Sequence, residues 1–230
     1  MESFTDFRQV KNTLQKHFLT QTMYDKKDNP SSYFPDKIDN LFWCIFIHKY
    51  SLDEYLEIEC KYKNREMEEK MKIAELIKKD LQCMKQMKIT KVDTQTMIGD
   101  IMTNEKINLF SLHALSLYYQ LHIYIVCKEN KTYIEYNNLA SNICIIYKNT
   151  SLTKESNTKY SVDLQVEDKK KQDIEIIKNQ FFKYEKYNAI VKTISNYKKH
   201  ELDSILTKLN LVHNLTKPSK QDIYDLIAII

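Results

Sequence analysis

The chain carries the apolar run Phe110-Ser-Leu-His-Ala-Leu-Ser-Leu-Tyr-Tyr119, which predicts a helix. Three short segments follow it: His122-Ile-Tyr-Ile-Val126, Thr132-Tyr-Ile-Glu-Tyr136 and Ile143-Cys-Ile-Ile-Tyr147. A fourth begins at Lys159-Tyr-Ser-Val162. Their length and their content of β-branched and aromatic residues are typical of strands. We therefore expect a helix followed by a small, mainly antiparallel sheet of three or four strands.

Upstream of this block the sequence predicts mainly helices. Apolar residues recur at helical spacing over residues 3–19. The run Leu41-Phe-Trp-Cys-Ile-Phe-Ile47 predicts a buried helix with Asp39 or Asn40 as its N-cap. Residues 52–103, rich in Glu, Lys, Met and Leu over much of their length, predict a helical insertion. The fold class is accordingly α+β, a helix-rich domain over residues 1–165.

Downstream of the strands the sequence predicts two further parts. Residues 166–193 open with a charge run and predict a helical linker. Residues 194–230 hold two amphipathic segments and predict a C-terminal helical hairpin. Ser219 is suited to cap the second helix, with Asp222 three residues later in a shortened capping box.

Composition excludes several classes of function. The 230 residues include one glycine, so the glycine-rich loops of nucleotide-binding enzymes are not expected, and no cofactor is predicted. Five scattered cysteines show no zinc spacing, so no metal site is predicted and free thiols in a reducing compartment are expected. The net charge of +4 is too small to indicate a nucleic-acid partner by itself. Neither a signal peptide nor a membrane span is expected.

Two segments resemble the OTU family of papain-like cysteine proteases. The family pattern Asn-Cys-Leu-Phe-Arg-Ala-Ile is similar to the run from Asp39 to Ile45, and the family's final strand opens with His-Tyr where this chain has Lys159-Tyr160. In this register Asn40 stands at the position of the nucleophilic cysteine and Lys159 at that of the general base. Because a lysine ammonium has no lone pair to take a thiol proton, the resemblance implies a degenerate site.

A different papain-like register makes Cys44 the nucleophile, with His48 one helical turn away as a candidate base. Cys44 lies several residues inside the predicted helix among bulky apolar neighbours, which favours a structural thiol. His113 and His122 flank the apolar helix and first strand and are expected to be structural. The alternative function is therefore a cysteine protease or deubiquitinase that uses Cys44.

The C-terminal hairpin resembles SAP-like modules, which bind DNA through lysines near the starts of their helices. The lysines that the resemblance assigns to phosphate contacts are Lys198, Lys199, Lys208, Lys217 and Lys220. The chain lacks the glycine that such modules usually have between the helices. The alternative is a hairpin that packs on the main domain or on a partner protein.

The six tyrosines in and beside the predicted strands offer a further alternative, a sheet that stacks nucleic-acid bases. They are Tyr118, Tyr119, Tyr124, Tyr133, Tyr136 and Tyr147. The AT-rich codons of the abundant Lys, Ile, Asn and Tyr explain their number equally well.

The whole chain also resembles uncharacterised proteins of large eukaryotic DNA viruses, in Pro35, Asp39 and Leu41–Cys44 and in the ending Ile194–Ile227. This resemblance implies a non-catalytic viral structural or DNA-associated protein. It would be located in the viral factory of the host cytoplasm or in the virion, associated with the capsid, and its partners would be other viral proteins and DNA.

Overall fold

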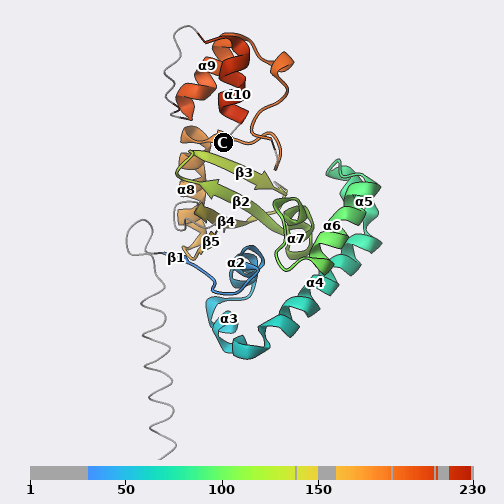
Figure 1. The fold of residues 1–230 in the computed structure, drawn as a ribbon. Helices are drawn as coiled ribbons and strands as arrows, with labels where there is room; N and C mark the ends of the chain where they lie inside the picture. Colours follow the sequence, from blue (N-terminus) through green and yellow to red (C-terminus); the bar gives the residue numbers. More distant parts are fainter. Residues whose placement is uncertain are drawn as a thin grey trace, which may run out of the picture.

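The computed structural model describes residues 31–137, 139–149, 159–187, 189–209, 211 and 218–228 (Figure 1). The helix expected over residues 3–19 and the candidate Lys217 lie outside these ranges. Helices and one sheet pack together in the described part of the chain, which confirms the expected mixture of helices and a small sheet.

The sheet is mixed and has six strands among the described residues, in the order β1-β5-β4-β2-β3-β6. The strands are β1 (Ser32–Tyr33), β2 (Leu121–Cys127), β3 (Thr132–Tyr136), β4 (Asn142–Asn149), β5 (Lys159–Asp163) and β6 (Phe182–Lys183). The pairs β2–β4 and β3–β6 are parallel, and the other three pairs are antiparallel. A parallel pair thus lies at the centre of the sheet.

The expectation of three or four strands is therefore corrected. The four expected segments form β2 to β5, and the two-residue strands β1 and β6 extend the sheet at its edges. Strands of two residues are too short to show an alternating pattern. The strand β3 returns beside β2, and the chain then crosses to the other side of β2 to form β4, which makes the central pair parallel.

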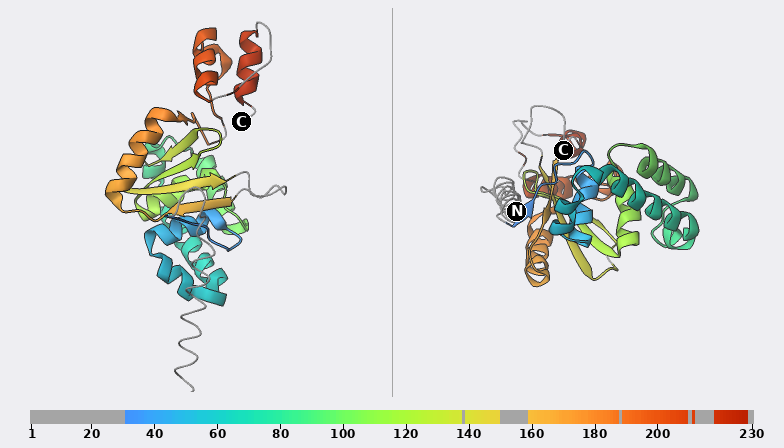
Figure 2. Two further views of the ribbon diagram at one scale, coloured as in Figure 1. Left: turned by 90° about the vertical axis from the view of Figure 1, so that its left-hand side faces the viewer. Right: turned by 90° about the horizontal axis from the view of Figure 1, so that it is seen from below.

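Residues 52–103 are largely helical, as expected. The helices before and beside the sheet are α2 (Asn40–Lys49), α3 (Leu52–Ile58), α4 (Tyr62–Lys79), α5 (Leu81–Gln86), α6 (Lys91–Thr103) and α7 (Leu112–Tyr119), with the 3-10 turns η1 (Glu59–Lys61) and η2 (Leu109–Ser111). Figure 2 shows this helical region on one side of the sheet. Most of the Glu and Lys residues of segment 52–103 lie at exposed positions of these helices.

The larger core lies between this helical region and one face of the sheet. Helix α2 is buried from Leu41 to Ile47 and packs against β5 and β4. Trp43 has ring contacts with Phe42, Phe46 and Tyr55. Because every side chain in this run is apolar, α2 is buried on all of its faces along these residues.

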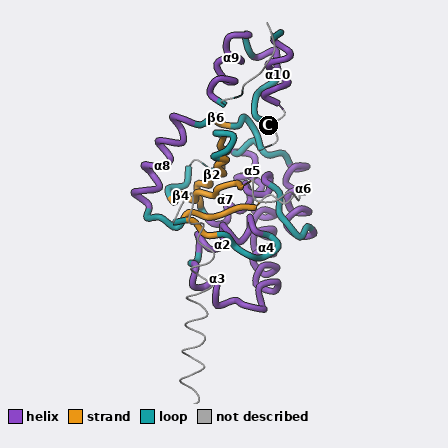
Figure 3. Tube along the Cα trace, turned by 60° about the vertical axis from the view of Figure 1, so that its left-hand side comes forward, coloured by secondary structure: helices purple, strands orange, loops and turns teal. Residues whose placement is uncertain are grey.

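The first half of the segment 166–193, expected as a helical linker, is a helix that covers the other face of the sheet. Helix α8 (Glu167–Gln180) packs Ile174 and Ile177 against Tyr124, Val126 and Ile145. Figure 3 shows α8 apart from the other helices, on the far side of the strands. The chain then forms β6, which pairs with β3. These residues are therefore part of the same packed body as the sheet.

The C-terminal hairpin has its own small core. It comprises η3 (Ile194–Asn196), α9 (Lys199–Lys208) and α10 (Lys220–Ala228), beyond one end of the sheet in Figure 1. Leu202, Leu206, Ile223 and Ile227 are buried between the two helices. The cap predicted for α10 is present: Ser219 N donates to Asp222 Oδ2 at 2.8 Å, and Asp222 N donates to Ser219 Oγ at 3.2 Å.

Candidate functional site

The two positions assigned to the degenerate protease site lie in one cleft. Asn40 is the first residue of α2, and Lys159 is the first residue of β5. Both line a cavity of about 410 Å³, together with Lys106, Ile107 and other residues near the start of α2. The sequence places these positions more than a hundred residues apart, and the packing of α2 on β5 brings them together.

The side chain of Asn40 is held at both ends. Its Nδ2 donates to the carbonyl oxygen of Pro35 at 2.7 Å, and its Oδ1 accepts a hydrogen bond from the backbone N–H of Tyr160. The amide therefore ties the segment before α2 to the residue that follows Lys159. An amide in this role positions the backbone and supplies no nucleophile.

Asp39, a buried acidic residue, lies beside the cleft at the start of α2. Asp39 caps α2 by accepting the N–H of Phe42, and its other oxygen accepts the N–H of Ile107 at 3.1 Å. The same oxygen lies 2.6 Å from Nζ of Lys70. The carboxylate is thus fully engaged, and its charge is balanced within the protein.

Cys44 is not accessible in this structure. Its side chain is 0% exposed and belongs to the core between α2 and the sheet. Burial, with a smaller effect from Cys144 and Asp39, raises the pKa of the thiol well above its usual value. Since the thiolate is the reactive form, this environment makes Cys44 inert.

His48 is engaged elsewhere. Its Nε2 lies 3.3 Å from Asn142 Oδ1, and its Nδ1 lies 3.3 Å from Nζ of Lys170. Because the ammonium can only donate, Nδ1 accepts and Nε2 carries the proton. Burial and the Lys170 charge lower the pKa of His48 to about 4. Cys44 and His48 therefore do not form an exposed nucleophile–base pair.

The other sequence candidates on the main body are structural in their contacts. His122 Nε2 lies 2.7 Å from Glu135 Oε1, and the ring of His113 packs edge-on against Phe110 and Tyr136. The proposed stacking tyrosines provide no exposed platform, because five of them are buried and Tyr118 is half-buried.

The C-terminal hairpin brings three of its candidate lysines to one end. Lys198 and Lys199 precede and begin α9, and Lys220 begins α10. Lys199 Nζ donates to the carbonyl oxygen of Pro218, so the starts of the two helices are adjacent. Lys208 is at the opposite end of α9. Lys198, Lys199 and Lys208 are exposed, and Lys220 is half-buried.

Two carboxylates reduce the positive charge at this end of the hairpin. Glu201 accepts the backbone N–H of Lys198 at 2.6 Å, and Asp222 accepts that of Ser219. Each helix start therefore already has an acidic cap that satisfies an N–H group. A phosphate here would be bound through lysine side chains more than through the helix ends.

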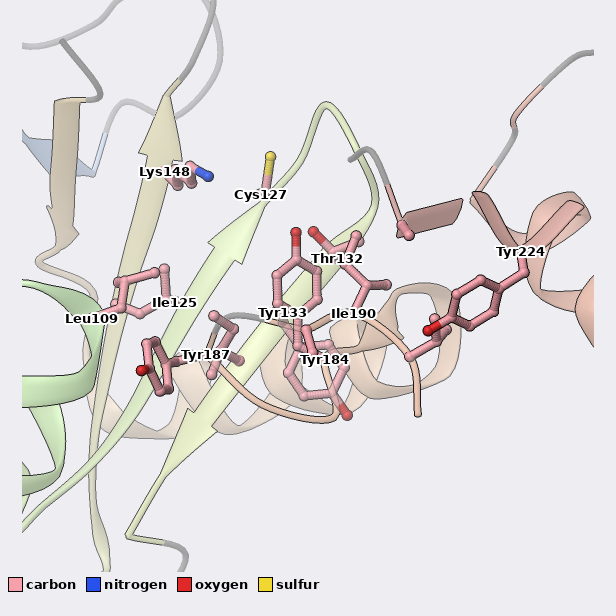
Figure 4. Close-up of a pocket in the computed structure, with 14 residues that line it drawn as sticks. Leu109, Ile125, Cys127, Thr132, Tyr133, Lys148, Tyr184, Tyr187, Ile190 and Tyr224 are labelled. Atoms are coloured by element: carbon pink, nitrogen blue, oxygen red, sulfur yellow. The ribbon is translucent and has the colours of Figure 1, made fainter. Parts of the chain in front are cut away.

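The structure also contains a second cavity, of about 430 Å³, that the sequence did not predict (Figure 4). Its lining comes from η2, β2, β3, β4, the segment after β6 and α10, and includes Tyr184, Tyr187 and Tyr224. Residues from six segments meet there, and none of these segments carries a recognisable motif. In the sequence, only the closely spaced tyrosines Tyr184 and Tyr187 point to this cavity.

Comparison with known proteins gives no relative: the chain matches no protein-family model, none of the curated proteins and no solved structure. None of the helices in the part of the chain that the structure describes has the length and apolarity required to cross a bilayer.

Proposed function

We propose that this chain is a non-catalytic binding protein of a large DNA virus, in which a protease-like scaffold lacks reactive residues and the C-terminal hairpin associates with DNA. One observation supports the proposal most: Asn40 and Lys159 line one cleft while Cys44 is wholly buried. The resemblance implies a nucleophile at the start of a helix and a base at the start of a strand. At these two positions the cleft holds Asn40 and Lys159, which cannot act as nucleophile and base.

The alternative function, a protease that uses Cys44, has no support from the geometry. A nucleophile must reach a substrate carbonyl, and the Cys44 side chain is buried in the core between α2 and the sheet. His48 is bound to Asn142 and Lys170 and has a pKa of about 4, so its ring nitrogens are occupied.

Association with DNA is supported by the end of the hairpin where α9 and α10 begin. Lys198, Lys199 and Lys220 gather there, and their side chains would supply the phosphate contacts. With three phosphate contacts, the logarithm of the affinity should fall with the logarithm of the salt concentration with a slope of about −3. Binding through only three phosphate contacts suits a component that acts beside other viral proteins in a viral factory or virion.

The test is fluorescence anisotropy of a labelled DNA duplex with the full chain at low salt. The double variant Lys198→Glu/Lys199→Glu should weaken binding by roughly tenfold or more and reduce the size of the salt slope by about two. The matched control is Lys169→Glu/Lys171→Glu, which makes the same charge change near the start of α8, outside the hairpin. Equal binding by both variants and the unmodified protein would refute the association.

A further inference from the structure

The cavity of about 430 Å³ lies at the carboxyl ends of the two central parallel strands. Cys127 is the last residue of β2, and Lys148 is the last but one of β4. They follow Val126 and Tyr147, which are register partners, so Cys127 and Lys148 lie side by side, as Figure 4 shows. The carboxyl ends of parallel strands are a common place for ligands in α/β proteins.

The floor of this cavity is apolar. Ile125 and Ile134, on the adjacent strands β2 and β3, are 3% and 8% exposed. Cys127, beside them, is 5% exposed. A floor of this kind favours contact with an uncharged, flat surface of a ligand.

The walls of the cavity are aromatic. Tyr184 and Tyr187 come from the segment after β6, and Tyr224 extends from α10 toward the sheet in Figure 4. Tyr187 is partly exposed and is held by Phe110, with ring centroids 5.0 Å apart and planes inclined by 31°. Tyrosines placed around a slot stack on planar rings, and their hydroxyl groups stay able to form hydrogen bonds.

One positive charge lies beside these walls. Lys148 is half-buried, and no carboxylate in the described ranges lies within ion-pair distance of its ammonium group. Lys128 is on the other face of the sheet, where its Nζ lies 4.2 Å from the ring centroid of Tyr147. A ligand with one anionic group would supply the missing negative charge.

We propose that this cavity binds a small planar aromatic anion, with its ring between the tyrosines and its acidic group at Lys148. The volume is within the range of small-molecule sites, roughly 300–1,000 Å³, and such sites often lie where two units meet. A single ammonium is too little for a polyanion, and a small anion without a ring would leave the aromatic walls unused. The site is separate from the DNA-binding end of the hairpin.

The test uses 8-anilinonaphthalene-1-sulfonate, a planar aromatic anion that fluoresces when bound, with the full chain. Saturable binding at a single site is expected. Lys148→Gln should weaken it by roughly tenfold or more, because a charge-assisted contact is lost. Ala228→Phe, at an exposed position of α10 that lines the cavity, should weaken it by occupying part of the space. The matched control Lys128→Gln, with the same charge change on the opposite face, should bind as the unmodified protein does.

Competition separates the ring from the charge and identifies the source of the ligand. Displacement by thymidine monophosphate would point to nucleotides, and displacement by 4-hydroxybenzoate would point to aromatic acids; either supports the proposal. Equal displacement by methanesulfonate, which has the charge without a ring, would overturn it. Displacement by neither aromatic compound would also overturn it, as would equal dye binding by Lys148→Gln in a protein whose melting temperature is unchanged.

Discussion

Nζ of Lys70 lies 2.6 Å from Oδ2 of Asp39, and both side chains are buried. Lys70 also contacts Glu66 at 2.7 Å within α4. Burial alone would lower the pKa of Lys70, but the neighbouring carboxylates of Asp39 and Glu66 raise it above its usual value. The pair joins α4 to the start of α2 and, through the N–H of Ile107, to the segment after α6. It therefore holds the cleft that contains Asn40 and Lys159.

Breaking this pair should destabilise the protein strongly. Lys70→Met leaves Asp39 buried without its counter-charge, which typically costs about 3–5 kcal/mol in the free energy of unfolding. The matched control is Lys171→Met in α8, because the Lys171 side chain is 61% exposed and its partner Asp168 is 92% exposed. That change should cost less than about 1 kcal/mol. Urea unfolding of both variants measures the difference, and equal losses would contradict the prediction.

Acid should weaken the fold through His113 before most carboxylates titrate. Burial lowers the pKa of His113 to about 4, below the value of roughly 6.5 for an unfolded chain. Between these values the unfolded chain binds a proton that the folded protein does not, so stability falls as the pH decreases through 6.5 toward 4. From pH 7 to pH 5 this effect is about 2 kcal/mol.

The variant His113→Phe should remove that part of the pH dependence. The new ring has Phe110 and Tyr136 as neighbours, as the imidazole does. His48, whose pKa is also about 4, remains in both proteins and contributes equally. Urea unfolding at pH 7 and pH 5 gives the comparison. An identical loss of stability in the variant and in the unmodified protein would show that His113 does not carry the effect.

The cleft itself can be tested by restoring the residues that the family pattern contains. Asn40→Cys combined with Lys159→His places a thiol at the start of α2 and an imidazole at the start of β5. A helix N-terminus and a nearby imidazolium both lower a thiol pKa, so the introduced thiol should react roughly tenfold faster with iodoacetamide at neutral pH than in Asn40→Cys combined with Lys159→Gln, which has no basic side chain at that position. Equal rates would show that the two positions do not act on each other.

Sequence patterns predicted the elements whose own side chains decide their structure. The uniform apolar run of α2 and the cap formed by Ser219 and Asp222 are local signals, and the structure contains both. The strands β2 to β4 were predicted because their apolar side chains are dense, and β5 was predicted where the family resemblance places a final strand. Their order was not predicted, since the crossover from β3 to β4 depends on how the chain packs.

Features that depend on distant partners were missed. The strands β1 and β6 are strands only because Tyr33 pairs with Val162 and Lys183 with Tyr133. The ion pair of Lys70 and Asp39 joins residues 31 positions apart, with no motif to connect them. Asn40 and Lys159 could be expected together only through a family resemblance.

The most direct measurement of the central claim is residue-resolved labelling of the native protein, by mass spectrometry, with iodoacetamide and with a ubiquitin vinyl-sulfone probe. Cys60 is exposed and serves as the internal positive control. We expect rapid iodoacetamide labelling of Cys60, no reaction of Cys44 with either reagent, and labelling of Cys44 only after unfolding in urea. Rapid modification of Cys44 in the folded protein, lost in Cys44→Ala, would contradict a non-catalytic scaffold.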